Sequence, residues 1–394
     1  MSVPPAPPRS VLVVGAGLAG HATAQALRRQ GYDGRVTVLG DETERPYDRT
    51  PLTKEFLAGR VGTDDLRLEA DGEDLDVDWH LGVHAVALDP ARRVVSTGDG
   101  REWTADAVVL AAGARARRLT GPAGLHTVRT VADSAALRGE LVPGARLVVI
   151  GAGWVGAEVA STAAGLGLDV TVLEAAATPL AGPLGEEMGT VVAGLHARHG
   201  VTLRCGVPVA GVQGTDRVTG VELADGTVVP ADVVVAGIGA APAVDWLVGS
   251  GLDLSAGVVC SAVGATDAPG VYAVGDCSAW FDPVLGRPLR VEHWTDARER
   301  PAVLARLLLE GRADPPPRPP YFWSDQYGVR VQFAGRRHGD ETVTVEAGDP
   351  ADASVLAVYR RHGEPVAVLG MNQTKLFTRL RRSLATPQPV PAVP

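Results

Sequence analysis

Two glycine triplets stand where the chain could hold the phosphates of a nucleotide. Gly15, Gly17 and Gly20 follow the apolar run 11–14 with the spacing G-x-G-x-x-G. In this pattern the first glycine makes a tight turn, the second lets the backbone approach a pyrophosphate, and the third lets the next helix pack against the strand. Free N–H groups and the helix dipole would attract the phosphates. The first triplet therefore predicts a dinucleotide site.

The whole unit occurs a second time. Gly151, Gly153 and Gly156 follow a strand over 146–150 and precede a helix over 158–166. Glycines after a strand often make only a turn, but two complete units in one chain favour dinucleotide binding. In both units a second strand ends on a carboxylate suited to a ribose hydroxyl, Asp41 in the first and Glu174 in the second. The predicted loop contacts also include Leu18, Ala19, Trp154 and Val155.

Strand and helix patterns alternate around both triplets. A helix over 22–27, a strand over 36–39 and a buried strand over 107–110 follow the first triplet. Strands over 170–173 and 233–236 follow the second. This alternation predicts an α/β fold with two Rossmann-like dinucleotide-binding domains.

Two groups of shorter alternating segments predict antiparallel sheets. A small set is expected over 201–212, 218–223 and 227–229. A small α+β C-terminal domain is expected from a closing helix over 375–384 and strands over 329–333, 342–346, 355–359 and 366–369.

The composition excludes several classes of partner. Lys and Arg total 37 against 46 Asp and Glu, a formal charge of -9, which gives nonspecific nucleic-acid binding no global electrostatic support. No apolar run approaches membrane-spanning length, and residues 1–10 lack the regions of a signal peptide. We therefore expect no nucleic-acid partner, no membrane partner and a cytoplasmic protein of two or three domains.

The three cysteines predict neither metal binding nor thiol chemistry. Cys205, Cys260 and Cys277 are far apart, and none belongs to a C-x-x-C pair or has metal-ligand spacing. A flavin enzyme that passes electrons through its own dithiol needs two neighbouring thiols. We expect three small buried side chains in a reducing compartment and no bound metal.

Several runs outside the triplets have a more specific pattern. They are Arg45–Lys54 (RPYDRTPLTK), Thr266–Asp276 (TDAPGVYAVGD), Arg290–Trp294 (RVEHW) and Phe322–Tyr327 (FWSDQY). Together with both triplets they resemble the FAD- and NADH-dependent ferredoxin reductases of the putidaredoxin-reductase and biphenyl-dioxygenase-reductase type, over residues 10–384. The flavin domain of apoptosis-inducing factor is a more distant relative. Thr50 and Thr53 stand where that family usually has Pro and Ser.

The resemblance implies where FAD and NADH would be bound. Besides the first loop and Asp41, the family's FAD contacts fall on Arg49, Lys54, Ala85, Arg129, Gly275, Asp276, His293 and Trp294. Besides the second loop and Glu174, its NAD contacts fall on Glu158, Gly237, Glu292 and Trp323. Taken alone, Arg129 would be an arginine at a helix start, and Glu158 a carboxylate stabilised by a helix dipole.

Lys54 and Glu158 are the candidate catalytic residues. The family places Glu158 beside the nicotinamide and within reach of the loop lysine, which predicts a Lys54–Glu158 ion pair near the flavin. Neither residue needs to transfer a proton. Glu174 would repel a 2'-phosphate and residues 175–178 supply no arginine to hold one, so the predicted donor is NADH.

The resemblance also implies the domain organisation. The expected parts are a disordered tail (1–9), an FAD-binding domain (10–118 and 247–314), an NAD-binding domain (119–246), a proline-rich linker (315–320), a C-terminal domain (321–384) and a second disordered tail (385–394).

The predicted function is electron transfer from NADH through FAD to a [2Fe–2S] ferredoxin that serves a cytochrome P450 or another oxygenase. The cluster must belong to the partner, since the chain offers no ligands for one. An acidic ferredoxin would need a basic surface, for which the C-terminal domain offers Arg330, Arg336, Arg337, Arg360, Arg361, Lys375, Arg379, Arg381 and Arg382. We expect a monomer or homodimer. Alternatives are another acceptor, such as rubredoxin, oxygen or a disulfide, and an NADH-sensing flavoprotein like apoptosis-inducing factor.

Overall fold

The structure is a computed structural model that describes residues 6–70, 73–314 and 319–384. Its contacts divide the chain into two compact units. Of the described residues, the first contains 6–48, 67–70, 73–115 and 241–314, and the second contains 49–66, 116–240 and 319–384. The expected tails and linker lie largely outside the described residues. The predicted domain boundaries, which are defined by the ligand each part binds, stay predictions.

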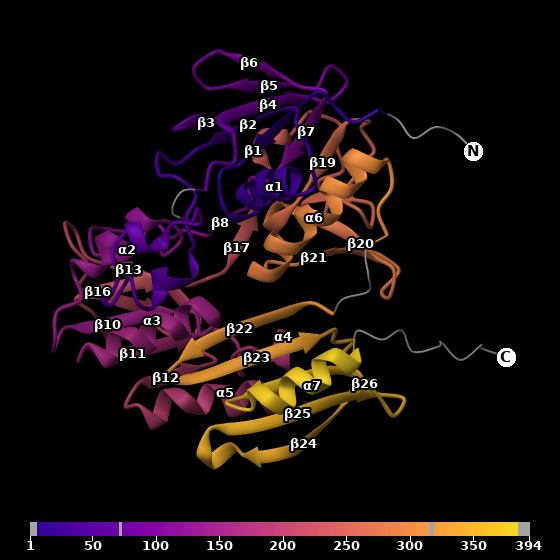
Figure 1. Cartoon of the computed structure of the whole chain (residues 1–394). Coiled ribbons are helices and arrows are strands. Elements are labelled where there is room, and N and C mark those ends of the chain that lie inside the picture. Colours follow the sequence, from indigo (N-terminus) through magenta and orange to yellow (C-terminus); the bar gives the residue numbers. More distant parts are fainter. Residues whose placement is uncertain (1–5, 71–72, 315–318, 385–394) are drawn as a thin grey trace. The chain divides into compact units, whose positions relative to one another are not determined.

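The first unit is built on a five-stranded sheet in the order β19-β7-β1-β2-β3, with parallel neighbours throughout (Figure 1). Its strands are β1 (Ser10–Val14), β2 (Arg35–Gly40), β3 (Asp78–Leu81), β7 (Ala107–Leu110) and β19 (Val271–Ala273). Buried valines and leucines fill the central strands, which is typical of a parallel sheet covered on both faces. Helices α1 (Leu18–Arg29) and α6 (Trp294–Glu310) pack against each other beside it.

Two small sheets complete the first unit. One is antiparallel and contains β4 (Ala85–Asp89), β5 (Val94–Thr97) and β6 (Glu102–Thr104). The other has the order β18-β20-β21, formed by Val258–Cys260, Ser278–Asp282 and Arg287–Arg290. The chain crosses between the units in β8 (Ala114–Ala116) and β17 (Ala240–Pro242), which pair with each other.

The second unit repeats the parallel architecture in the order β12-β11-β10-β16-β9. The strands are β9 (Leu125–His126), β10 (Arg146–Ile150), β11 (Asp169–Glu174), β12 (Thr202–Cys205) and β16 (Val233–Ala236). The accompanying helices are α2 (Val131–Arg138), α3 (Trp154–Gly165), α4 (Ala181–Leu184) and α5 (Glu186–Arg198). The predicted fold class is confirmed by these two sheets.

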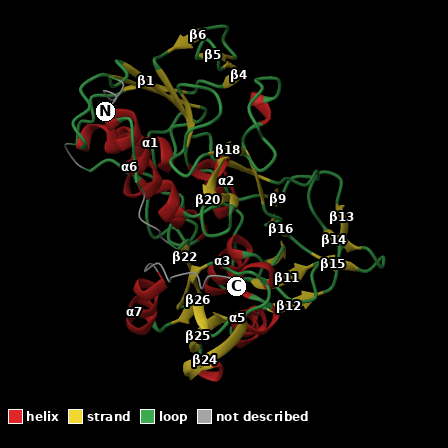
Figure 2. Cartoon of the chain, turned by 90° about the vertical axis from the view of Figure 1, so that its right-hand side faces the viewer, coloured by secondary structure: helices red, strands yellow, loops and turns green. Residues whose placement is uncertain are grey.

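One sequence expectation was wrong in its sheet assignment. Residues 201–212 were expected to begin the small antiparallel set, but Thr202–Cys205 forms β12, which pairs in parallel with β11. The antiparallel set contains only β13 (Val209–Gln213), β14 (Gly220–Leu223) and β15 (Val228–Pro230), which lie together in Figure 2. The alternation continues across a turn at Gly206 (φ +68°), so periodicity alone could not separate the two strands.

The C-terminal part of the second unit is an antiparallel sheet in the order β22-β23-β26-β25-β24. Its strands are β22 (Tyr321–Gln326), β23 (Val329–Gly335), β24 (Thr342–Asp349), β25 (Ser354–Arg361) and β26 (Glu364–Met371). Helix α7 (Thr374–Leu384) packs on β23 and β26 (Figure 1). Its buried Phe377 lies over Gly370, where a Cβ would come within 3.0 Å of the ring.

The other face of this C-terminal sheet packs on α4 and α5. Leu184, Met188 and Leu195 share one buried cluster with Val331 and Tyr359. The Tyr359 hydroxyl donates to the carbonyl O of Leu184 at 2.7 Å, so the buried phenol is satisfied. This shared core fixes β22 against the glycine-loop helix of the same unit.

Candidate active site

The first glycine loop joins β1 to α1 through two close backbone approaches. Gly15 has φ +119°, and a Cβ there would lie 2.2 Å from the carbonyl O of Ala111. A Cβ on Gly20 would lie 1.9 Å from the carbonyl O of Gly15, whereas one on Gly17 would meet nothing within 4 Å. The packing of the loop requires the first and third glycines, and the second leaves the backbone open.

The second loop has the same geometry in the second unit. Gly151 has φ +99°, and a Cβ there would lie 2.4 Å from the carbonyl O of Gly237. A Cβ on Gly156 would lie 2.1 Å from the carbonyl O of Gly151, and one on Gly153 would meet nothing within 4 Å. The carbonyl of Gly237 therefore packs directly against Gly151, and the predicted contact of Gly237 with NAD stays a prediction.

Both loops fit a bound pyrophosphate. Gly17 and Gly153 are the N-caps of α1 and α3, and neither can supply a side-chain acceptor to the first turn. Neither helix has an acidic residue in that turn. Their N–H groups are thus available for phosphate oxygens, which the helix dipoles also attract.

The two predicted ribose carboxylates are held differently. Glu174 accepts from the backbone N–H of Ala152 through Oε2 at 2.8 Å and from that of Ala176 through Oε1 at 2.9 Å. Its carboxylate is therefore fixed beside the second loop. Asp41 Oδ1 lies 2.9 Å from His84 Nδ1, with its side chain 67% exposed. The predicted ribose contacts of both residues stay predictions.

Gly275 and Asp276 reach the start of α1, although Gly275 lies 256 positions after Ala19 in sequence. They lie in a 3₁₀ turn, Gly275–Cys277, and a Cβ on Gly275 (φ +73°) would lie 2.7 Å from Ala19 Cβ. His293 is the N-cap of α6; burial lowers its pKa to about 4, and the Asp276 charge opposes that shift. The ring is therefore neutral at pH 7.

Other predicted contact residues lie on separate elements. Arg49 and Arg129 come together, because the Arg49 guanidinium donates to the Arg129 carbonyl O at 2.6 Å. Glu292 pairs with the neighbouring Arg290. Ala85 begins β4 and Trp294 begins α6 in the first unit. Trp323, on β22, stacks on Tyr321 with 6.0 Å between the ring centroids. Their roles toward a cofactor stay predictions.

Lys54 and Glu158 form the predicted ion pair, with Nζ 2.7 Å from Oε2. Both side chains are largely buried, at 14% and 10% exposure. Lys54 follows a 3₁₀ helix, Thr50–Thr53, whose position is fixed by two hydroxyls. Ser134 donates to the Leu52 carbonyl at 2.6 Å and Thr162 to the Thr53 carbonyl at 2.7 Å.

Two hydroxyl residues at this pair were not among the predicted site residues. Thr53 Oγ1 donates to Glu158 Oε2 at 2.6 Å, and Ser324 Oγ donates to Glu158 Oε1 at 2.8 Å. Both lie within runs that carry the family resemblance. Apart from that resemblance, no sequence pattern distinguishes Thr53 and Ser324 from ordinary buried hydroxyl residues.

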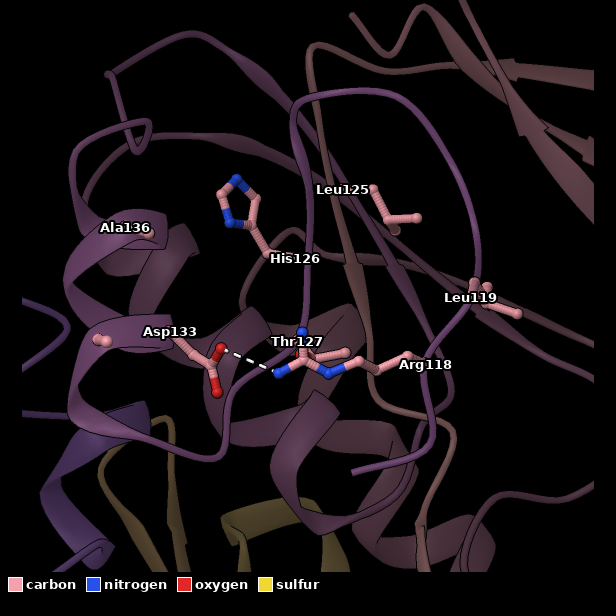
Figure 3. Close-up of a pocket in the computed structure, with 8 residues that line it drawn as sticks. Arg118, Leu119, Leu125, His126, Thr127, Asp133 and Ala136 are labelled. Carbon is pink, nitrogen blue, oxygen red and sulfur yellow. Dashed lines mark hydrogen bonds and ion pairs between the residues drawn. The ribbon is translucent and has the colours of Figure 1, made fainter. Parts of the chain in front are cut away.

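The pocket drawn in Figure 3 is a different site. It lies in the second unit between β9 and α2 and is lined by Arg118, Leu119, Leu125, His126, Thr127, Ala132, Asp133 and Ala136. Arg118 reaches Asp133 at 3.4 Å across its mouth. None of the predicted site residues lines it.

Metal-ligand groups and membrane helices were sought in the same residues. Over 6–70, 73–314 and 319–384, no cluster of three or more His, Cys, Asp or Glu side chains could hold a metal ion. None of the helices described is long and apolar enough to cross a membrane.

Burial keeps two cysteines in their thiol form. It raises the pKa of Cys260 to about 12 and that of Cys277 to about 11. Burial and the Glu174 charge also raise the pKa of Cys205. Because the thiolate is the reactive species, these side chains favour a structural role.

Comparison with known proteins identifies the class. Residues 9–300 match the family model described as pyridine nucleotide-disulphide oxidoreductase, and residues 321–393 match a reductase C-terminal model. The chain is 38% identical over 381 residues to a ferredoxin–NAD(P)(+) reductase of Sphingomonas sp, covering 94% of this chain and 92% of the relative.

Two further relatives narrow the class. The ferredoxin–NAD(+) reductase component of the biphenyl dioxygenase system of Paraburkholderia xenovorans (strain LB400) is 36% identical, with coverage of 96% and 93%. The crystal structure of a covalent putidaredoxin reductase–putidaredoxin complex matches with a TM-score of 0.91 at 31% identity, with coverage of 95% and 93%.

The two Rossmann-like sheets and the antiparallel C-terminal sheet thus define a flavoprotein oxidoreductase of the pyridine-nucleotide class. Within it, the chain belongs to the ferredoxin reductase family of the putidaredoxin-reductase and biphenyl-dioxygenase-reductase type, an enzyme family that uses FAD and NAD(P)H. The sequence-based family, fold class and enzyme class are confirmed.

Two alanine substitutions should separate packing from ligand approach in the second loop. Gly156→Ala forces a Cβ onto the Gly151 carbonyl, and we expect it to lower the free energy of unfolding by about 2 kcal/mol. Gly153→Ala meets no protein atom and gives up only the N-cap preference for glycine over alanine, so it should cost less than about 1 kcal/mol of stability but raise the Kd for NADH roughly tenfold, about 1.4 kcal/mol. Denaturant unfolding and NADH titration measure both. Equal losses of stability in Gly156→Ala and Gly153→Ala would contradict the assignment of packing to Gly156 and of ligand approach to Gly153.

Proposed function

We propose that this chain transfers electrons from NADH through FAD to a [2Fe–2S] ferredoxin that serves a cytochrome P450 or another oxygenase. The observation that carries the proposal is the duplicated glycine loop: both copies have an open central glycine, a helix N-terminus and a nearby carboxylate. Two such loops suit two different dinucleotides. The chain works in the cytoplasm under this proposal, consistent with its three free cysteines.

The chain's own residues would bind and orient the two nucleotides. FAD, when bound, supplies the change from two-electron hydride chemistry to one-electron transfer. One NADH would thus reduce two ferredoxins and release one proton. The first loop and the Gly275–Asp276 turn would hold FAD, and the second loop and Glu174 would hold NADH. Lys54, kept in place by Glu158, would present its ammonium to the flavin.

Spectroscopy of the purified protein tests the proposal. A flavin absorbance band that NADH bleaches rapidly, followed by rapid reduction of an added [2Fe–2S] ferredoxin, is the expected result. Bleaching without ferredoxin reduction would favour rubredoxin, oxygen or a signalling role. A folded, colourless protein that cannot be reconstituted with FAD would exclude the proposal.

The preference for NADH rests on Glu174. Its carboxylate is held by two backbone N–H groups, so it cannot easily move away from a 2'-phosphate. An ionised carboxylate fixed at the ribose favours the two hydroxyls of NADH and repels the phosphate of NADPH.

Replacing this carboxylate should therefore weaken the discrimination. For Glu174→Ala we expect kcat/KM for NADH to fall about tenfold, the scale of one charge-assisted hydrogen bond, while kcat/KM for NADPH rises. Steady-state kinetics with a dye acceptor measures the ratio. Glu222→Ala, on β14, is the control and should leave the ratio unchanged. An unaltered ratio in Glu174→Ala would remove the assignment.

Several basic residues of the C-terminal domain are already engaged by other protein groups, which leaves fewer candidates for docking a ferredoxin. Arg330 pairs with Asp325, Arg360 with Glu346 and Arg361 with Asp340. Arg337 donates to the carbonyls of Ala181 and Gly182 within the second unit, so its guanidinium is already engaged and we leave it out of the proposed docking surface.

Apart from Arg336, which follows β23, the remaining basic residues of the set lie on α7. Arg381 lies over the Tyr321 ring, 3.8 Å from its centroid. Lys375, Arg379 and Arg382 are exposed, and no carboxylate of the described residues forms an ion pair with them. We therefore assign the docking of an acidic ferredoxin to α7.

Charge reversal on α7 tests this assignment. For Lys375→Glu/Arg379→Glu we expect the KM for ferredoxin to rise about tenfold at low salt, because two attractive charges become repulsive, and the difference to shrink at high salt. NADH-dependent dye reduction should not change. Arg92→Glu, in the first unit, is the charge control. Equal loss of dye and ferredoxin activity would contradict docking at α7.

A further inference from the structure

The carboxylate of Glu158 has its hydrogen-bonding capacity filled by the protein. Oε2 accepts from Thr53 Oγ1 at 2.6 Å and Lys54 Nζ at 2.7 Å. Oε1 accepts from Ser324 Oγ at 2.8 Å and the Asp325 N–H at 3.2 Å. A carboxylate has about four lone-pair positions, so four donors leave no position for a ligand. The carboxylate of Glu158 therefore holds its protein neighbours in place, and its contact with a nicotinamide stays a prediction.

One face of α3 organises this contact. Glu158, Ser161 and Thr162 share it, because residues three and four positions apart lie on the same side of a helix. Glu158 and Ser161 contact β22, since Ser161 Oγ accepts from the Tyr327 N–H at 2.6 Å. Glu158 and Thr162 contact the 3₁₀ helix that precedes Lys54. The helix thus joins the lysine segment to the C-terminal sheet.

Ser324 is itself held in one orientation. It is 1% exposed, and Gln326 Nε2 donates to its oxygen at 3.3 Å. The hydroxyl proton is therefore left to point at Glu158 Oε1. Asp325, the next residue, is fixed as well, because the Arg330 guanidinium donates hydrogen bonds to both oxygens of its carboxylate, at 2.9 and 3.0 Å.

The Lys54 ammonium keeps one donor for a ligand. Of its three N–H groups, one goes to Glu158 Oε2 and one to Thr53 Oγ1 at 3.2 Å. In the part of the chain that the structure describes, the third has no acceptor. Its direction depends on Oε2 staying where it is, and the donors on Oε1 oppose rotation of the carboxylate.

We propose that Ser324, on the C-terminal domain, is a positioning residue that aims the Lys54 ammonium at the flavin through Glu158. The inference rests on the proposed function. Without the Ser324 hydroxyl, Oε1 has a vacant lone pair that can capture the Lys54 ammonium in a two-oxygen contact. The third N–H would then turn away from its ligand.

Ser324→Ala in the FAD-loaded protein tests this inference. We expect the rate of flavin reduction by NADH in stopped flow to fall fivefold to tenfold, the scale of one hydrogen bond to a charged group. The KM for NADH should change less than twofold. The flavin midpoint potential should become more negative, since a displaced ammonium stabilises reduced flavin less. Ser324→Thr, which keeps the hydroxyl, should restore both values, and Thr190→Ala, which removes an exposed hydroxyl on α5, is the matched control.

Two further variants keep the test decisive. In a Glu158→Gln background, Ser324→Ala should have no additional effect on the potential, because the two residues act as one unit. If Ser324→Ala does not fold, Gln326→Met should cause a smaller change in the same direction. A folded Ser324→Ala with wild-type reduction rate and potential would overturn the inference. A protein without a flavin band would instead defeat the proposed function, so the two failures are distinguishable.

Discussion

A carboxylate removed from water must find its hydrogen bonds inside the protein, and the second unit is arranged around one such group. Glu158 is 8% exposed and accepts from residues 105 positions before it and 166 positions after it in sequence. Leaving any of these donors or the carboxylate unpaired would be strongly unfavourable. The lysine segment, α3 and β22 are consequently held in one arrangement, although they come from three distant parts of the chain.

The lysine segment shows why this constraint matters. Residues 49–66 contain only two 3₁₀ turns, Thr50–Thr53 and Asp64–Leu66, so local hydrogen bonding cannot fix their position. Their place is set by buried Leu52, Phe56 and Leu57 and by hydroxyl donors from α2 and α3. A functional lysine on an irregular segment is thereby given the rigidity that a regular element would otherwise supply.

The sequence predicted best what depends on local sterics. Each glycine triplet is readable because its first and third members lie within van der Waals distance of a backbone carbonyl, which any Cβ would violate. The strands flanking the triplets follow from continuous apolar runs. The Lys54–Glu158 pair came only from the family resemblance, since no spacing rule joins residues so far apart. The sequence could not predict the contacts that Thr53, Ser324 and His84 make with charged side chains, because folding alone brings those charges beside them.

Charge and burial also decide which acceptor the fold can serve. The matching family model is named for disulphide chemistry, yet Cys260 and Cys277 are buried among backbone carbonyls, and their thiol protons are retained at physiological pH. A thiol with a pKa of about 11 exposes almost no thiolate at pH 7, and thiolate is what attacks a disulfide. Cys260 and Cys277 therefore do not offer a reactive dithiol to electrons that reach a flavin in this chain. An external one-electron carrier is the outlet that this arrangement favours, as in the relatives whose partners are ferredoxins.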